Sequence, residues 1–367
     1  MSVPLMLLHT VVRWLDFLAL TTLLGGLVFQ CLIVWPTLLS REGFDSFEAR
    51  RHKIGAGAIV LVALTSVGDL ILRTLVMSGG TLTNLGFALP VVLSQTHYGR
   101  VWIARIVLVG LLAIGLLLRR PGTGRPHWSL WGSLIGAVLI ALTTTLSGHA
   151  ADWGDGTLPV VIDWLHLLAI STWIGGLFTL GFVLPSSVAS PGKGETVRGL
   201  ASIAARFSRM AACCMADFLV TGWYNAWLQV ASLPPLLNTS YGWTLLAKLS
   251  LLLLVLTIAA VNRYYFLHHF EHHPGARDWP LFRAIGRIAG TLATGKQHGD
   301  PGNMRHQFLR VVRLEWIVAV GMLACAALLT QLPPARHIRR HEHREQHAIH
   351  RTEQGLATAT LSPGRGR

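Results

Sequence analysis

The sequence predicts an all-α fold, a polytopic membrane bundle of about eight transmembrane helices. Of its 367 residues, 52% are hydrophobic and only 13% are charged, and the mean hydropathy is +0.50. A soluble domain carries about 25% charged residues, so this chain has too few to cover a globule in water. The apolar residues also cluster in blocks of roughly the 20 residues that a helix needs to cross hydrocarbon. We therefore expect a lipid bilayer to be the solvent.

Each apolar block is expected to form a helix, because lipid offers no partner for open backbone groups. The first block has no basic segment before it, is long for a signal peptide and contains Asp16, so we expect it to stay in the mature protein. The expected spans are 5–38, 54–77, 100–118, 130–147, 158–184, 207–230, 243–262 and 314–332.

The positive charges alternate between the loops and predict the orientation. Lys and Arg number four in 39–53, three in 119–128, four in 185–209 and eight in 263–313, whereas 78–99, 148–160 and 231–242 contain none. Because short basic loops stay in the cytoplasm, both termini are expected on the outer side. The tail after Leu332, with seven Arg, then also falls outside, against the rule. Charge spread over alternating loops does not predict nucleic-acid binding.

An internal duplication divides the chain. Residues 14–27 (WLDFLALTTLLGGL) match residues 164–177 (WLHLLAISTWIGGL), and YGRVWIAR at 98–105 matches YGWTLLAK at 241–248. Between these blocks, Thr65 and Asp69 correspond to Thr221 and Asn225. Because each copy has four helices, both insert the same way up, which predicts two parallel repeats.

The expected domains follow from this duplication. The first repeat covers 1–150 and the second 151–332, with a cytoplasmic loop at 263–313. The His- and Arg-rich segment 333–367 is expected to be disordered.

Several charged residues fall inside the expected spans. Asp16, Asp69 and Arg105 are candidates for a transport path, or for structural ion pairs, because charges in a bilayer face the bundle and have partners. Asp69 and Arg105 have similar depths on adjacent helices, so we expect them to pair with each other.

Three histidines are the candidate metal ligands. His9, His149 and His166 are all expected near the outer side, and the short turn before the fifth span brings His149 and His166 close. Imidazole binds copper, zinc, iron and nickel, although a lone membrane histidine is more often a hydrogen-bonded packing residue.

Sulfur ligands are expected deeper, where they would suit Cu(I). The alternative is plain core packing, since sulfur side chains are common core fillers. Two His-rich tracts, HHFEHH at 268–273 and the tail histidines, could bind divalent metals by composition. The candidate sulfur residues are Cys31, Met210, Cys213, Cys214, Met322 and Cys325.

No catalytic motif is present in the sequence: there is no P-loop, HExxH, GxSxG or CxxC. The chain is therefore not expected to be an enzyme. None of the four cysteines falls in an outer loop, so no disulfide framework is expected.

The sequence resembles the copper resistance protein D family (CopD, PcoD). The resemblance is carried by SGHAADWGD, by WLHLLAISTWIGGL, by the stretch from RFSRMAACCMADF to YGWTLLAKLSLLLL, and by NRYYF. It is strongest over 140–332. It implies a bacterial inner-membrane protein of copper uptake or tolerance, acting beside a periplasmic copper-binding protein of the CopC type. The histidine positions of the family would fall on His149 and His166, with His9 in the first helix.

Three functions are compatible with these patterns. The first is copper import, with outer histidines as ligands and a path at the repeat interface. The second is a b-type haem electron carrier, which needs paired axial imidazoles and is disfavoured because the first repeat has Asp16 where the second has His166. The third is an assembly or sensing factor that binds metal without transporting it.

Overall fold

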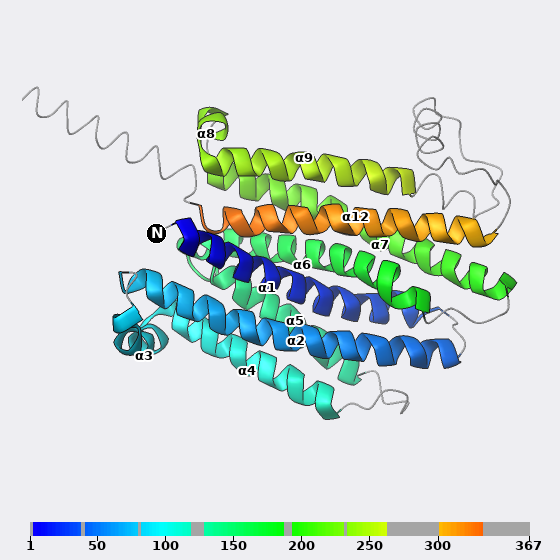
Figure 1. Ribbon diagram of the computed structural model, residues 1–367, viewed down its shortest axis with the longest axis horizontal. Helices are drawn as coiled ribbons and strands as arrows, with labels where there is room; N and C mark the ends of the chain where they lie inside the picture. The colour runs from blue at the N-terminus through cyan, green and yellow to red at the C-terminus, as the bar shows by residue number, and fades with distance from the viewer. Residues whose placement is uncertain are drawn as a thin grey trace, which may run out of the picture.

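The computed structural model describes residues 3–37, 41–79, 82–118, 128–186, 193–230, 233–262 and 301–332. Within these ranges there are no strands, and eight helices of 19 residues or more run along a common direction (Figure 1). The all-α bundle is thus confirmed. The long helices are α1 (Val3–Phe29), α2 (Arg41–Met77), α4 (His97–Leu118), α5 (Trp128–Leu146), α6 (Leu158–Phe178), α7 (Lys193–Val230), α9 (Ser240–Val261) and α12 (Pro301–Leu329).

Seven of these helices are long and apolar enough to cross a membrane, among the residues described. They coincide with seven of the eight predicted spans. The eighth span, 207–230, lies in α7, which has 38 residues but is less apolar and carries Arg209 and Asp217 within that stretch. In Figure 1, α7 nevertheless runs alongside the other seven.

Two helices extend beyond their predicted spans. Much of the basic segment 39–53, expected as a loop, belongs to α2, and much of 185–209 belongs to α7. Two short helices, α3 (Leu85–Gln95) and α8 (Leu233–Asn238), form at the end of the bundle where the N-terminus lies (Figure 1). The chain returns to this same end at the end of α12.

Helices α1 and α6 cross in direct backbone contact. A Cβ atom built on Gly25 would lie 2.5 Å from the Cα of Gly175, and one built on Gly175 would lie 1.9 Å from the carbonyl oxygen of Thr21. Only glycine allows so close an approach, as in other membrane helix pairs. Gly25 and Gly175 are matching positions of the duplicated blocks, so the halves meet at equivalent points.

A hydrophobic core lies on each side of this crossing. The first joins Leu20, Val62, Val109 and Ala137 of α1, α2, α4 and α5. The second joins side chains from α6, α7, α9 and α12, including Ile170, Phe218, Val255 and Leu323. Each half of the chain therefore has its own core, and α1 contributes to both.

Local details recur at matching positions. After α1 and α6, the chain forms π-helical segments, η1 (Gln30–Val34) and η4 (Thr179–Val183). At the start of α4 and of α9, a threonine hydroxyl accepts a hydrogen bond from the backbone N–H of a glycine three residues later, at 2.9 Å for Gly99 and 3.0 Å for Gly242. These repeated contacts agree with the duplication read from the sequence.

The outer surface of the bundle carries large apolar side chains. Leu117, Trp223 and Trp227 are 82%, 75% and 71% exposed. Such a surface would be a liability in water, whereas in a membrane it is the lipid-facing surface.

Candidate functional site

A buried ion pair joins three helices of the first half. The guanidinium of Arg105 on α4 donates to the carboxylate of Asp16 on α1, with Nη2 and Oδ1 2.6 Å apart. Its Nε donates to Ser66 on α2 at 2.8 Å, and Thr65 donates to Asp16 at 2.9 Å. Both charged groups are almost fully buried, and in this pair each neutralises the charge of the other in the bundle interior.

Asp69 is the centre of a second group of contacts in the same half. It accepts from Tyr98 at 2.7 Å, from Arg73 at 3.1 Å and, across from α1, bonds His9 Nε2 at 2.8 Å. The predicted pairing of Asp69 with Arg105 is therefore wrong, because Arg105 binds Asp16 instead. Depth along the helices had suggested the pair, but rotation about the helix axes gives Asp69 other partners.

The second half has different chemistry at the matching positions. Asp16 and Thr65 are replaced by His166 and Thr221, whose side chains are hydrogen-bonded at 2.9 Å between Nδ1 and Oγ1. Both halves therefore have a hydrogen bond between their first two helices. The group bonded to the threonine is a carboxylate in the first half and an imidazole in the second.

The contact beside it is also kept with different groups. In the first half, Arg13 on α1 lies 3.9 Å from Asp69 on α2. In the second half, Asp163 on α6 accepts a 3.1 Å hydrogen bond from Asn225 on α7. The acidic residue of this contact is Asp69 on the second helix of the first repeat, but Asp163 on the first helix of the second repeat.

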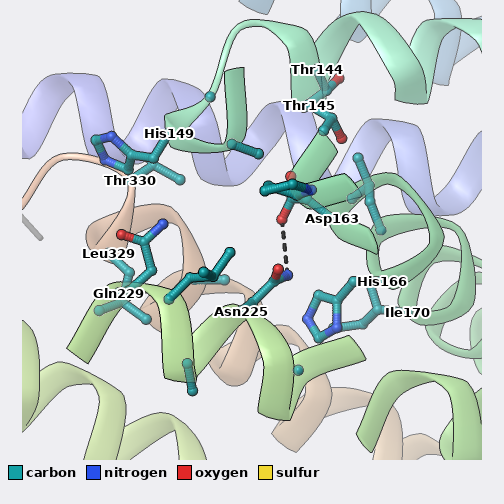
Figure 2. A pocket seen from close by; sticks show the side chains of 18 of the residues that line it. Thr144, Thr145, His149, Asp163, His166, Ile170, Asn225, Gln229, Leu329 and Thr330 are labelled. Carbon is teal, nitrogen blue, oxygen red and sulfur yellow. Dashed lines mark hydrogen bonds between the residues drawn. The ribbon is translucent and has the colours of Figure 1, made fainter. Parts of the chain in front are cut away.

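A cavity of about 210 Å³ opens around these second-half residues. His149, on the short η3 helix (His149–Trp153), and His166, on α6, both line it, with the Asp163–Asn225 pair between them in the view of Figure 2. Arg13 reaches it from α1 and Lys248 from α9. The cavity thus offers two imidazoles and one carboxylate, which are ligands of transition metals, beside two cations.

The position of His166 is fixed by its neighbours. Its ring stacks on Phe218 with centroids 4.4 Å apart, and Thr221 bonds its Nδ1. A Cβ on Gly222 would lie 3.1 Å from Cε1 of the imidazole, so the glycine leaves room for the ring. In the first half, Ser66 holds the matching position and bonds Arg105 instead.

The first half has almost no open space at the equivalent place. The cavity bordered by Asp16, Asp69 and Arg105 measures only about 10 Å³. Its polar groups are bonded to one another, whereas those of the second half surround a volume that can hold a ligand. Of the two equivalent sites, the second-half cavity is therefore the candidate binding site.

The three predicted histidine ligands are not brought together. His9 does not line the second-half cavity and is instead bonded to Asp69, while His149 and His166 share the cavity. Within the described ranges, no three His, Cys, Asp or Glu side chains are arranged to hold a metal ion. Metal binding by His149 and His166 stays a prediction.

The predicted sulfur residues do not line one path. Cys31 belongs to the first-half core and Met322 to the second-half core, and Met210 packs against both. Cys213 is exposed on α7, and Cys214 and Cys325 are partly buried. The His-rich tracts at 268–273 and in the tail lie outside the described residues.

Several polar residues of the site were not predicted as site residues. Arg13, Asp163, Asn225 and Lys248 line the cavity, and Arg13 borders both halves. Extending the duplicated block by one residue would have matched Arg13 with Asp163 and drawn attention to both.

Two family models match the chain. One, described as copper resistance protein D-like, N-terminal domain, matches residues 4–160, and the other, described as copper resistance protein D, matches residues 201–329. The boundary between the two matches falls near the boundary between the halves of the fold.

Curated relatives carry related names. The chain is 26% identical to the copper transport protein CutJ of Bacillus subtilis, over 88% of this chain and 52% of that protein, so it spans about half of that relative's length. It is 30% identical to copper resistance protein D of Pseudomonas syringae, over 67% of this chain and 81% of that protein. It is 24% identical to the inner membrane protein YebZ of Escherichia coli, over 65% of this chain and 70% of that protein. No solved structure matches the chain.

Proposed function

This chain belongs to the copper resistance protein D family, and we propose that it moves copper into the cell across a bacterial inner membrane through the His149–His166 cavity. The single observation that supports the site is the contrast between the halves. Equivalent polar positions are closed by ion pairs in the first half and surround about 210 Å³ in the second.

The chemistry of the cavity suits a transition-metal ion. Neutral imidazoles place no charge in the bundle while the site is empty, and copper accepts imidazole nitrogen readily. The hydroxyl of Thr221 orients His166, as the outer partners of metal-binding histidines commonly do.

The proposed orientation places the cavity at the outer side. The N-terminus, the end of α12 and the cavity lie at the same end of the bundle, the end that the basic loops predict to be outside. A periplasmic copper-binding protein of the CopC type would deliver the ion there. The proposal assigns no catalytic step to the chain.

Copper accumulation in expressing cells tests the function. Changing both His149 and His166 to alanine should reduce accumulation to that of cells without the protein. His97→Ala is the matched control, because His97 is a partly exposed histidine that pairs with Asp155 and does not line the cavity. Parent-like accumulation in the double variant would exclude this site.

Two measurements separate the alternatives. Proteoliposomes loaded with a Cu(I) chelator should accumulate copper if the protein transports it, and a protein that binds copper without flux would be an assembly or sensing factor. The purified protein should show no Soret absorption band, since such a band would favour the haem-carrier function instead.

A further inference from the structure

A second cavity, of about 230 Å³, lies in the same half of the chain. It is lined by residues of α6, α7, α9 and α12, among them Trp173 of α6, Met215 of α7, Asn262 at the end of α9 and Glu315 of α12. Most of the remaining lining is apolar, from alanine, leucine and phenylalanine side chains. Glu315 was not among the predicted site residues.

Glu315 on α12 is a deeply buried acidic residue. It is 3% exposed, and in the parts of the chain that the structure describes no Lys, Arg or His nitrogen lies within 4.0 Å of it. Its contacts are with neutral groups, the amide of Asn262 at 3.5 Å and the indole of Trp173. The other acids described above, Asp16, Asp69 and Asp163, have stronger or charged partners.

A second oxygen acceptor at this cavity is the amide oxygen of Asn262. It is buried in the cavity wall and has no hydrogen-bond partner among the described residues. A buried acceptor without a donor is destabilising, and a buried charge without a partner is more so. Two oxygen acceptors and the thioether of Met215 therefore border one space, and together they are ligands that a cation could bind.

The two cavities lie in series along the same helices. On α12, Glu315 precedes Leu323, which lines the first cavity, by eight residues, or about 12 Å of helix. Between the lining residues of the two cavities on α7, α9 and α12 lie Phe218, Val255 and Met322, which are core side chains less than 5% exposed and line neither cavity. An ion leaving the first cavity toward the opposite end of the bundle would meet the second after this apolar layer.

We propose that the cavity around Glu315 is a second Cu(I) site, on the far side of the apolar layer from His149 and His166. The inference rests on the proposed copper function. The Glu315 carboxylate neutralises the single charge of Cu(I), and Met215 supplies the soft ligand that Cu(I) prefers.

Copper counting with the purified full-length protein tests this site. Anaerobic titration with Cu(I) against a coloured Cu(I) chelator gives the copper bound per chain for the parent and each variant. Glu315→Gln should bind one equivalent fewer than the parent, and His149→Ala with His166→Ala should lose a different equivalent, so that all three changes lose two. Copper bound by the His-rich tracts contributes equally to every variant.

Two further variants serve as controls. Glu315→Asp keeps the carboxylate and should regain copper lost in Glu315→Gln, which separates ligand loss from misfolding. Glu48→Gln changes another buried glutamate that does not line the cavity and should bind as the parent does.

The outcomes distinguish this inference from the proposed function. If Glu315→Gln binds as much copper as the parent, the second site is excluded, whatever the histidine variants do. An infrared carbonyl band of a protonated carboxyl group, lost in that variant while the copper count is unchanged, would assign Glu315 to a proton and overturn the copper assignment. If only the histidine variants keep all their copper, the His149–His166 site of the proposed function is excluded and the copper site at Glu315 stands.

Discussion

The buried pair of Arg105 and Asp16 yields a quantitative prediction about stability. The two side chains are 7% and 5% exposed and 2.6 Å apart, and Arg105 also donates to Ser66 and Thr144. Removing one partner of such a pair leaves an uncompensated buried charge, which costs about 3–5 kcal/mol. Asp16→Asn and Arg105→Gln should each lower the free energy of unfolding by about that amount.

The double variant should be less destabilised than the sum of the single ones. With both charges removed, neither is left unpaired, and the coupling energy should be about 0.5–3 kcal/mol in favour of the double variant. These energies form a double-mutant cycle of the parent, the two single variants and the double variant. Each is measured by unfolding the purified protein in detergent or lipid and following tryptophan fluorescence.

A surface pair is the matched control for this cycle. His97 and Asp155 are 2.9 Å apart, but their side chains are 40% and 58% exposed. Asp155→Asn should therefore change stability by only about 0–1 kcal/mol. Additive effects of Asp16→Asn and Arg105→Gln, or losses no larger than that of Asp155→Asn, would refute the argument that the first-half site is a structural ion pair.

Two further predictions concern the cavity and the helix crossing. Thr221→Val removes the hydroxyl that bonds His166 and should weaken Cu(I) binding in a chelator competition by about 10–100-fold, whereas Thr65→Val at the matching first-half position should not. Equal affinities in the two variants would count against the site. Gly175→Ala places a methyl group 1.9 Å from a carbonyl oxygen of α1 and should destabilise the protein by at least about 1–3 kcal/mol, whereas Gly110→Ala, with nothing within 4 Å, should be near neutral in the same unfolding assay.

The predicted spans came from a property that sequence carries directly. Hydrocarbon thickness sets the length of an apolar helix, so seven spans are recognisable without any knowledge of neighbours. The basic ends of α2 and α7 were expected as loops because charge excludes a segment from lipid, but it does not stop the helix from continuing into water.

The candidate site was only partly predictable. The duplicated blocks identified Asp16 and His166 as equivalent, and both occupy equivalent contacts with a threonine of the next helix. The pairing of Asp69 with Arg105 was wrong, because depth along a helix says nothing of which way a side chain faces around it. Glu315 was not predicted, because it belongs to no duplicated block or motif of the sequence. Its burial becomes apparent only when α12 packs against its neighbours.

By itself, the sequence determined that this chain enters a membrane, that its two halves are related, and which residue types could bind a metal. These features follow from composition and order, because hydrophobic length and repetition act locally along the chain. Only the tertiary structure decided which charges neutralise each other and where space remains. Both depend on the close crossing of α1 and α6 at Gly25 and Gly175 and on the rotation of each helix against its neighbours, which closes one repeat and leaves the other open.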